Sequence, residues 1–288
     1  MIDISRICLG RRSFPVAAKY CTGGTRPGIV RRIVSPIWSP LAFHALRHRE
    51  PPRGVELYFA DLTAFSSLSC NAAELELLSS AERDRADAMT AAQVRRDFVV
   101  SRILLRSVLG SRLGVHGGLL TFVLSEHGKP SISSADDSPP LHFNQSHSNG
   151  AWLLGLGFES AIGVDLETRR AVPNAHRLAE RVFTDCERAE LAAAQLAAAD
   201  ADPPDEVFLR GWTRKEAVLK AAGSGFTWNA REVQVGTDRR ARRVSLSRLP
   251  GQVASVFSVD LPVEGQAAVA TLSNETDFAH GEFFELQA

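Results

Sequence analysis

The sequence has few of the features that mark a secreted, membrane or zinc-binding chain. Its four cysteines, Cys8, Cys21, Cys70 and Cys186, lie far apart and form no CxxC pair. Neither a zinc knuckle nor a disulfide framework is therefore indicated, and a reducing, cytoplasmic location fits this usage. The longest apolar run, Ala151 to Phe158, falls well short of the roughly 18 residues of a membrane span. The N-terminus also lacks the continuous apolar stretch of a secretory signal.

The chain has no net charge, because 33 Lys and Arg residues balance 33 Asp and Glu residues. The balance is uneven, since residues 1–53 carry a net charge of +8 and the remainder carries −8. Residues 1–53 also mix Gly, Pro and Arg without a sustained period, which predicts a basic, disordered or loosely attached extension. We expect a solvated tail, although a nucleic-acid or targeting role is its alternative. For the protein as a whole we expect no nucleic acid and no membrane as a partner.

The rest has an ordinary globular composition, and its first half mixes strands with helices. The folded part is expected to begin near Gly54 with a strand at residues 55–59. Residues 71–88 predict one helix or two short ones, and residues 91–109 predict a clear helix that stops at Gly110. Further strands are predicted at residues 121–124, 141–144 and 151–157, with the last two forming a hairpin.

The second half repeats this mixture. A strand is predicted at residues 161–167, and helices at 174–182, 184–199 and 205–222. The remainder alternates as strands, notably at residues 253–259 and 267–272. We therefore predict an α/β (α+β) protein of two comparable halves, 54–160 and 161–288, that follow the extension 1–53.

The strand at residues 161–167 places two carboxylates on one of its faces. Side chains alternate along a strand, so Asp165 and Glu167 share the side of Gly163 while the apolar residues share the other. Paired carboxylates are costly to bury, so such a strand ends at a surface, at a basic partner or at a bound cation. A solvated acidic edge and a divalent-cation site are the two alternatives at this point.

The helix at residues 205–222 carries Glu216 and Lys220, which lie side by side because they are four residues apart. Taken alone, the two residues make a surface ion pair. Together with Asp165 and Glu167, however, Glu216 would complete an all-oxygen site, which suits Mg²⁺ and argues against zinc. Lys220 would then be placed to meet a phosphate.

A hydrolase interpretation of Ser146 and His147 fails on geometry. Adjacent residues in an extended segment face opposite ways, so these two cannot form a nucleophile-base pair by themselves. The chain also lacks a G-x-S-x-G elbow. His147 is expected in a loop, either as part of a polar turn or as a phosphate donor.

Four short motifs stand in a fixed order along the chain. They are His127-Gly128-Lys129-Pro130, Phe143-Asn144-Gln145-Ser146-His147-Ser148, Gly163-Val164-Asp165-Leu166-Glu167, and Trp212-Thr213-Arg214-Lys215-Glu216-Ala217 with Lys220, Gly223 and Gly225. This set resembles the motifs of the 4′-phosphopantetheinyl transferase superfamily, and most of all those of its long, Sfp-type subfamily. Each motif is weak alone, but four in this order and spacing are specific. The resemblance covers residues 54–280 and leaves the extension outside.

The resemblance implies a pseudo-dimer of two similar α/β subdomains with the active site in the cleft between them. It also implies a Mg²⁺-dependent enzyme that moves the 4′-phosphopantetheine arm of coenzyme A to a serine of an acyl or peptidyl carrier protein and releases adenosine 3′,5′-bisphosphate. Such carriers serve fatty acid, polyketide, nonribosomal peptide or siderophore synthesis. We expect a monomer, because one chain supplies both sides of the cleft.

Carried over residue by residue, the resemblance assigns a role to each motif. Lys220 would contact the pyrophosphate, and Ser146 and His147 would bind the nucleotide phosphates. Lys129 would sit at the adenine in its turn with Pro130. The metal ligands would be Asp165, Glu167 and Glu216. Family members also place basic residues around the 3′-phosphate of coenzyme A, for which the candidates here are Arg83, Arg85 and Arg96, although Glu82 and Asp97 intrude among them.

The implied chemistry agrees with the residues present. Attack by a serine hydroxyl at phosphorus mainly needs charge neutralisation, alignment and a proton acceptor. We predict Glu216, Lys220 and Asp165 as catalytic residues, with Glu216 as the proton acceptor and Glu187 as the competing candidate. Two other functions remain open, a Mg²⁺-dependent phosphohydrolase and a non-catalytic module that binds coenzyme A or carrier proteins.

Overall fold

The computed structural model describes residues 43–46, 54–65, 70, 72–133, 141–196, 202–223 and 228–275. The extension 1–53 lies outside the described residues except for one strand, β1 (Phe43–Leu46), and so does Gly225 of the fourth motif. The described chain combines helices with antiparallel sheets, which confirms the predicted α/β class. It forms two compact units, one from described residues within 64–120 and the other from those within 44–63 and 121–275.

The first unit is helical. Residues 71–88 form two short helices, α1 (Ala72–Leu75) and α2 (Ser80–Asp87), and α3 (Ala92–Leu113) follows. The helix α2 begins with a capping box, since the Ser79 hydroxyl accepts from Glu82 N and the Glu82 carboxylate accepts from Ser79 N. A short 3₁₀ turn, η3 (Gly117–Leu119), comes after α3.

The predicted end of α3 at Gly110 is wrong. The helix continues through Gly110 and ends at Gly114, whose φ of +69° is the left-handed conformation of a glycine C-cap. Gly110 serves packing instead, because a Cβ there would lie 2.8 Å from Gly117 N. A glycine that is needed for close approach therefore looked like a helix stop in the sequence.

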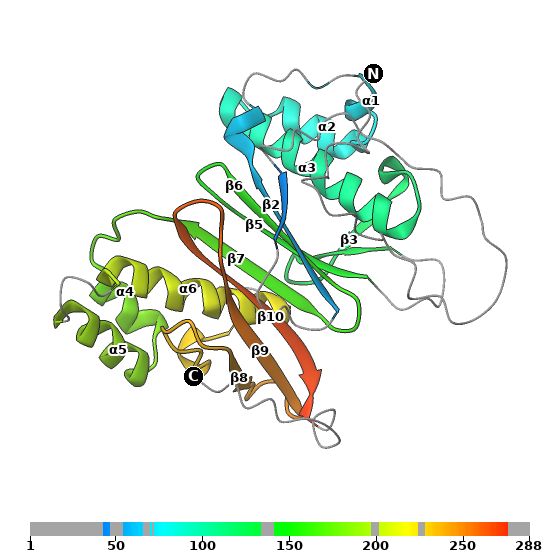
Figure 1. Ribbon diagram of the computed structural model, residues 1–288. Helices are drawn as coiled ribbons and strands as arrows, with labels where there is room; N and C mark the ends of the chain where they lie inside the picture. Colours follow the sequence, from blue (N-terminus) through cyan, green and yellow to red (C-terminus); the bar gives the residue numbers. More distant parts are fainter. Residues whose placement is uncertain are drawn as a thin grey trace, which may run out of the picture. The chain divides into compact units, whose positions relative to one another are not determined.

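The second unit holds two four-stranded sheets (Figure 1). The first sheet has the order β1-β2-β6-β5, with β2 at Val55–Asp61, β6 at Ala151–Gly157 and β5 at His142–Ser148. The strand β5 is longer than predicted, so His147 lies in a strand and not in a loop. The hairpin turns at Asn149 and Gly150, whose φ angles of +45° and +81° suit a two-residue turn. A separate two-stranded hairpin consists of β3 (Phe122–Leu124) and β4 (Pro130–Ile132).

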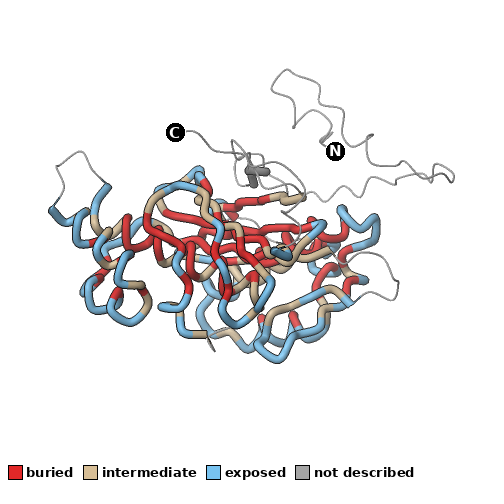
Figure 2. The backbone as a smooth tube through the Cα atoms, turned by 90° about the horizontal axis from the view of Figure 1, so that it is seen from below, coloured by how far each residue is buried: buried red, intermediate tan, exposed pale blue. Residues whose placement is uncertain are grey.

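The second sheet has the order β7-β10-β9-β8, and all of its neighbouring strands are antiparallel. The helix predicted at residues 205–222 is confirmed as α6 (Pro204–Ala221), which packs on β7, β9 and β10. Figure 2 shows in red that buried residues run along the strands. The remaining elements are β7 (Ile162–Thr168), β8 (Arg242–Ser245), β9 (Gln252–Val259), β10 (Gly265–Asn274), α4 (Ala175–Val182), α5 (Asp185–Leu196), η2 (Leu62–Phe65) and η5 (Ala230–Glu232).

The two sheets fall on either side of the predicted boundary at residues 160 and 161, although the compact units follow a different division. The boundaries of the halves therefore stay a prediction.

Within the described ranges, none of the helices has the length and apolar character needed to cross a bilayer.

Candidate active site

The two sheets of the second unit meet at their edge strands, where side chains of β5 bind the backbone of β7. The accepting side chains follow one another at intervals of two residues along β5, and the N–H groups that they bind follow at the same interval along β7. The two strands therefore run in the same direction. We call this row of bonds the β5–β7 seam. Its bonds run from Val164 N to Asn144 Oδ1 (2.8 Å), from Leu166 N to Ser146 Oγ (3.4 Å) and from Thr168 N to Ser148 Oγ (3.3 Å).

Asp165 is buried in the middle of β7 and is held on one oxygen only. Its Oδ1 accepts from Ser146 Oγ at 2.7 Å and lies 2.6 Å from Lys220 Nζ. Its Oδ2 is buried and has no hydrogen-bond partner within the described part of the chain. Burial raises the pKa of Asp165 above its ordinary value and outweighs the opposing effect of the Lys220 ammonium. A buried, unpartnered carboxylate oxygen is a group that a cation would satisfy.

Glu167 stands two residues further along β7 and repeats this arrangement. Ser148 Oγ donates to Glu167 Oε2 at 2.8 Å, and Arg170 Nε lies 3.5 Å from the same oxygen. The Glu167 side chain is 20% exposed, compared with 8% for Asp165. Each of the two acids of β7 is thus bonded by one serine of β5.

Glu216 of α6 is the third predicted ligand, and its carboxylate interacts electrostatically with those of Asp165 and Glu167. Burial raises the pKa of Glu216, and the carboxylates of Asp165 and Glu167 raise it further, while Lys220 lowers it. Among the described residues, no three His, Cys, Asp or Glu side chains are spaced to hold a metal ion. The oxygen donors and the unpartnered Oδ2 of Asp165 fit Mg²⁺, and the assignment of these ligands stays a prediction.

Close packing of α6 against β7 brings Lys220 to Asp165. Gly163 faces α6, where a Cβ would lie 2.1 Å from Ala217 O and 2.3 Å from Ala221 N. Only a residue without a side chain therefore allows this approach. The glycine of the third motif and the lysine of the fourth motif thus serve one geometry.

Lys129 links the β3–β4 hairpin to the C-terminal end of α6. Its Nζ donates to Lys220 O at 2.6 Å, to Ala221 O at 3.3 Å and to Ile162 O at 3.0 Å. The last carbonyls of a helix have no partner within the helix, so the ammonium caps them. Burial lowers the pKa of Lys129 from 10.5 to about 8. Pro130 follows at the start of β4, and the predicted adenine contact of these two residues stays a prediction.

Ser146 and His147 face opposite sides of β5, as strand alternation requires. Ser146 is buried against Asp165, whereas His147 is exposed. Their predicted contacts with the nucleotide phosphates stay a prediction.

The arginine candidates belong to the first unit. The Arg85 guanidinium lies over the Phe98 ring, 5.0 Å from its centroid, and Arg96 donates to Gln93 Oε1 at 2.8 Å. Glu82, which intrudes on this basic run, is the buried ion partner of Arg102 and Arg106. Binding of the 3′-phosphate by the arginine candidates stays a prediction.

Glu187, the competing proton acceptor, is fully buried and already accepts from several donors. Its Oε2 lies 2.8 Å from Lys215 Nζ. The same oxygen accepts from Thr184 N at 2.8 Å, and this bond belongs to the predicted capping box at the start of α5. Its Oε1 accepts from Val235 N at 2.8 Å and from Gly236 N at 3.1 Å. These bonds join α5, α6 and the segment before β8, so the structure favours a scaffolding role for Glu187 over proton transfer.

Our sequence interpretation missed the roles of Asn144 and Ser148 in the seam. Their signal was the spacing of two that they share with Ser146, which becomes informative only once β5 is known to continue through residue 148.

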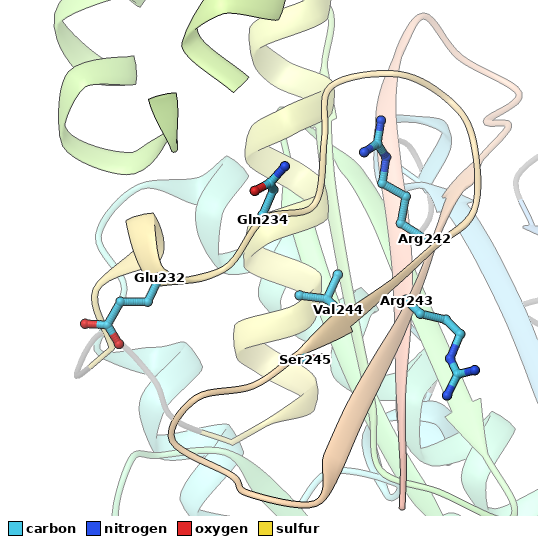
Figure 3. A pocket seen from close by; sticks show the side chains of 6 residues that line it. All are labelled: Glu232, Gln234, Arg242, Arg243, Val244 and Ser245. Carbon is cyan, nitrogen blue, oxygen red and sulfur yellow. The ribbon is translucent and has the colours of Figure 1, made fainter. Parts of the chain in front are cut away.

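An open hollow of about 470 Å³ lies elsewhere, beside β8, and none of the predicted site residues lines it (Figure 3). Its lining residues are Glu232, Gln234, Arg242, Arg243, Val244 and Ser245.

Comparisons with known proteins identify a family and several relatives. The family model of the 4′-phosphopantetheinyl transferase superfamily matches residues 161–272. The chain is 38% identical over 148 residues to the 4′-phosphopantetheinyl transferase HetI of Nostoc sp. (strain PCC 7120), covering 51% of this chain and 60% of HetI. It is 32% identical over 125 residues to Sfp of Bacillus subtilis (strain 168), covering 43% and 51% respectively. A further 4′-phosphopantetheinyl transferase of Bacillus subtilis is 30% identical over 162 residues, covering 52% of this chain and 67% of the relative. The matches to HetI and Sfp thus span only 51–60% of those curated relatives.

Proposed function

This chain belongs to the 4′-phosphopantetheinyl transferase superfamily, and we propose that it transfers the 4′-phosphopantetheine arm of coenzyme A to a serine of an acyl or peptidyl carrier protein, with Mg²⁺. The observation that carries the proposal is the environment of Asp165. One oxygen of this buried carboxylate binds Lys220, the other has no partner among the described residues, and Glu167 and Glu216 stand nearby. A buried carboxylate with one unpartnered oxygen, beside a lysine and further acids, suits a cation and a phosphate group.

Asp165, Glu167 and Glu216 would hold the Mg²⁺, which would supply charge neutralisation at the pyrophosphate of coenzyme A. Lys220 carries three N–H donors and directs one to Asp165 Oδ1 at 2.6 Å and one to Ser146 Oγ at 3.5 Å, so one remains to bind a phosphate oxygen. The carboxylate of Asp165 keeps the Lys220 ammonium oriented by this ion pair. Ser146 donates to the same oxygen and thereby limits rotation of Asp165.

Glu216 is proposed to accept the proton of the carrier serine, directly or through a water. Its raised pKa makes it a stronger base than an ordinary surface glutamate. The serine oxygen attacks the phosphorus that bears the pantetheine arm, and the bond from this phosphorus to the bridging pyrophosphate oxygen breaks. Adenosine 3′,5′-bisphosphate leaves with that oxygen, and the arm stays on the serine as a phosphodiester.

The test is to incubate the protein with coenzyme A, Mg²⁺ and several apo carrier proteins, and to follow the carriers by mass spectrometry. We expect the mass of the phosphopantetheine arm to appear on a serine of at least one of the carrier proteins. This addition should depend on Mg²⁺. Unmodified carriers throughout would contradict the proposal. Phosphate released without any carrier would indicate a phosphohydrolase. Binding of coenzyme A that survives Asp165→Ala, with no turnover by the parent, would indicate a non-catalytic binding module.

The carrier served, whether of fatty acid, polyketide, nonribosomal peptide or siderophore synthesis, would be identified by labelling in a cell extract. A fluorescent coenzyme A derivative would mark the carrier serine there. The proposal includes a monomer in the cytoplasm. Gel filtration with light scattering tests the monomer, and cell fractionation tests the location.

A further inference from the structure

We propose that Ser148 is a positioning residue for Glu167, an inference that rests on the function proposed above. The Ser148 hydroxyl donates to Glu167 Oε2 at 2.8 Å and accepts from Thr168 N at 3.3 Å. A hydroxyl has a single hydrogen to give. Since the Glu167 carboxylate can only accept, that hydrogen is directed to it, while the Thr168 hydroxyl oxygen lies further away, at 3.5 Å from Ser148 Oγ.

The same arrangement occurs two residues earlier in both strands. Ser146 donates to Asp165 Oδ1 and accepts from Leu166 N, as Ser148 does with Glu167 and Thr168. One serine of β5 therefore holds one acid of β7, and each hydroxyl is itself fixed by the next N–H group of the seam. The regular spacing of two assigns the two serines equivalent roles toward the two predicted metal ligands.

Glu167 needs such a partner more than Asp165 does. It is more exposed than Asp165, and its longer side chain has one more rotatable bond. Arg170 Nε lies 3.5 Å from the oxygen that Ser148 holds, and Arg170 is itself 44% exposed. Without the Ser148 hydroxyl, the carboxylate can turn toward this guanidinium, which competes with a cation for it. Ser148 thus keeps one oxygen of Glu167 in place and leaves Oε1 available.

The experiment compares Ser148→Ala with the parent by a binding measurement and by kinetics. Binding of Mn²⁺ in the presence of coenzyme A is measured from the electron paramagnetic resonance signal of free Mn²⁺. Partners that orient metal ligands typically change metal affinity about 10- to 100-fold. We therefore expect the Mn²⁺ dissociation constant to rise about 10-fold, with kcat at saturating Mg²⁺ close to that of the parent.

Three further variants separate positioning from general damage. Ser148→Thr keeps the hydroxyl and should restore parental Mn²⁺ affinity. Ser245→Ala removes an exposed serine from the edge strand β8 and should leave both Mn²⁺ affinity and kcat unchanged. Should Ser148→Ala be too unstable to purify, Ser148→Cys replaces the hydroxyl by a weak donor of similar shape and should also weaken Mn²⁺ binding.

Parental Mn²⁺ affinity in Ser148→Ala or Ser148→Cys would overturn this inference while leaving the proposed function intact. Equal losses in Ser148→Ala and Ser148→Thr would do the same, because the hydroxyl would then not be the cause. A parent protein that neither modifies a carrier nor binds Mn²⁺ with coenzyme A would instead contradict the proposed function.

Discussion

A Cβ atom on Gly163 would lie 2.1 Å from the carbonyl oxygen of Ala217, so the backbone of α6 rests directly on β7. This contact determines how far α6 stands from the acidic strand. Lys220 follows Ala217 by one helical turn, and its Nζ lies 2.6 Å from Asp165 Oδ1. The ion pair of the site therefore depends on a glycine that carries no chemistry.

Gly163→Ala should displace α6 and weaken both folding and transfer. Inserting a methyl group into such a close contact typically costs about 1–3 kcal/mol of unfolding free energy. We expect a lower midpoint in urea unfolding and a lower kcat, because Lys220 moves away from Asp165. A variant with parental stability would mean that α6 can yield at this point, and the proposed dependence of the site on Gly163 would be wrong.

Asp165→Asn should abolish transfer without unfolding the protein. The amide keeps the volume of the carboxylate but lacks its charge, so it binds a cation and Lys220 poorly, and we expect activity to fall by more than about 100-fold. Asp260→Asn is the matched control, since Asp260 is exposed and pairs with Arg239 outside the site. Circular dichroism checks the fold, and carrier modification followed by mass spectrometry checks the activity. Transfer at the parental rate by Asp165→Asn would exclude this residue from the site.

Glu216→Gln should lower transfer while raising stability at neutral pH. A carboxylate with a raised folded-state pKa costs stability above that pKa, and this cost disappears as the pH falls toward its ordinary value of 4.5. The gain in melting temperature should therefore be present at pH 7.5 and shrink in acid. Loss of a general base typically slows a reaction about 10²- to 10⁴-fold. Glu264→Gln, at an exposed position, should change neither quantity. Near-parental transfer by Glu216→Gln would assign the proton acceptor elsewhere.

Glu187→Gln should do the opposite of Glu216→Gln, because it should lower the stability of the protein much more than its transfer activity. Removing one charge of the buried Glu187–Lys215 pair leaves the other without a partner, which typically costs about 3–5 kcal/mol. Urea unfolding measures this cost. The fraction that remains folded at low temperature should still modify a carrier. A stable Glu187→Gln protein with no transfer would favour Glu187 as the acceptor.

Lys129→Met should remove a pH dependence of stability that the parent shows. Burial lowers the folded-state pKa of Lys129 from 10.5 to about 8, so the charged amine costs stability below about pH 8. That cost is relieved as the pH rises from about 8 to 10.5. The unfolding free energy of the parent relative to Lys129→Met should therefore increase across this window. Urea unfolding at pH 7.5, 9 and 10 measures the slope, and a constant difference would contradict the burial of this ammonium.

The sequence predicted those parts of the molecule that depend on local periodicity. The apolar stripe of α6, the acidic face of β7 and the capping box at Glu187 all follow from spacings of two to four residues. The residues assigned to the site come from the four motifs, although the roles of Asn144 and Ser148 within the second motif were missed. The pairing of Lys220 with Asp165 was not predicted, because the sequence places Lys220 beside Glu216 on one helix and does not show that α6 packs on β7.

What the sequence could not predict depends on contacts between distant segments. The polar residues from Gln145 to Ser148 resemble a turn in the sequence. The strand that bonds to the serine side chains, β7, lies 20 residues further along, so the sequence alone does not show it. The partners of Glu187 at Val235 and Gly236 are more distant still. Lys129 likewise reads as an exposed turn residue until the end of α6 is placed against it.

The seam between β5 and β7 also fixes the register of these two strands. Every bond in the seam recurs after two residues, so a shift of β7 by a single residue would replace both acids by uncharged side chains opposite the serines. A shift by two would restore the alternation but would give Ser146 the glutamate and leave the aspartate beside Asn144. The order in which the two acids are presented is therefore set by the register of the seam, whatever the length of the loop that joins β6 to β7.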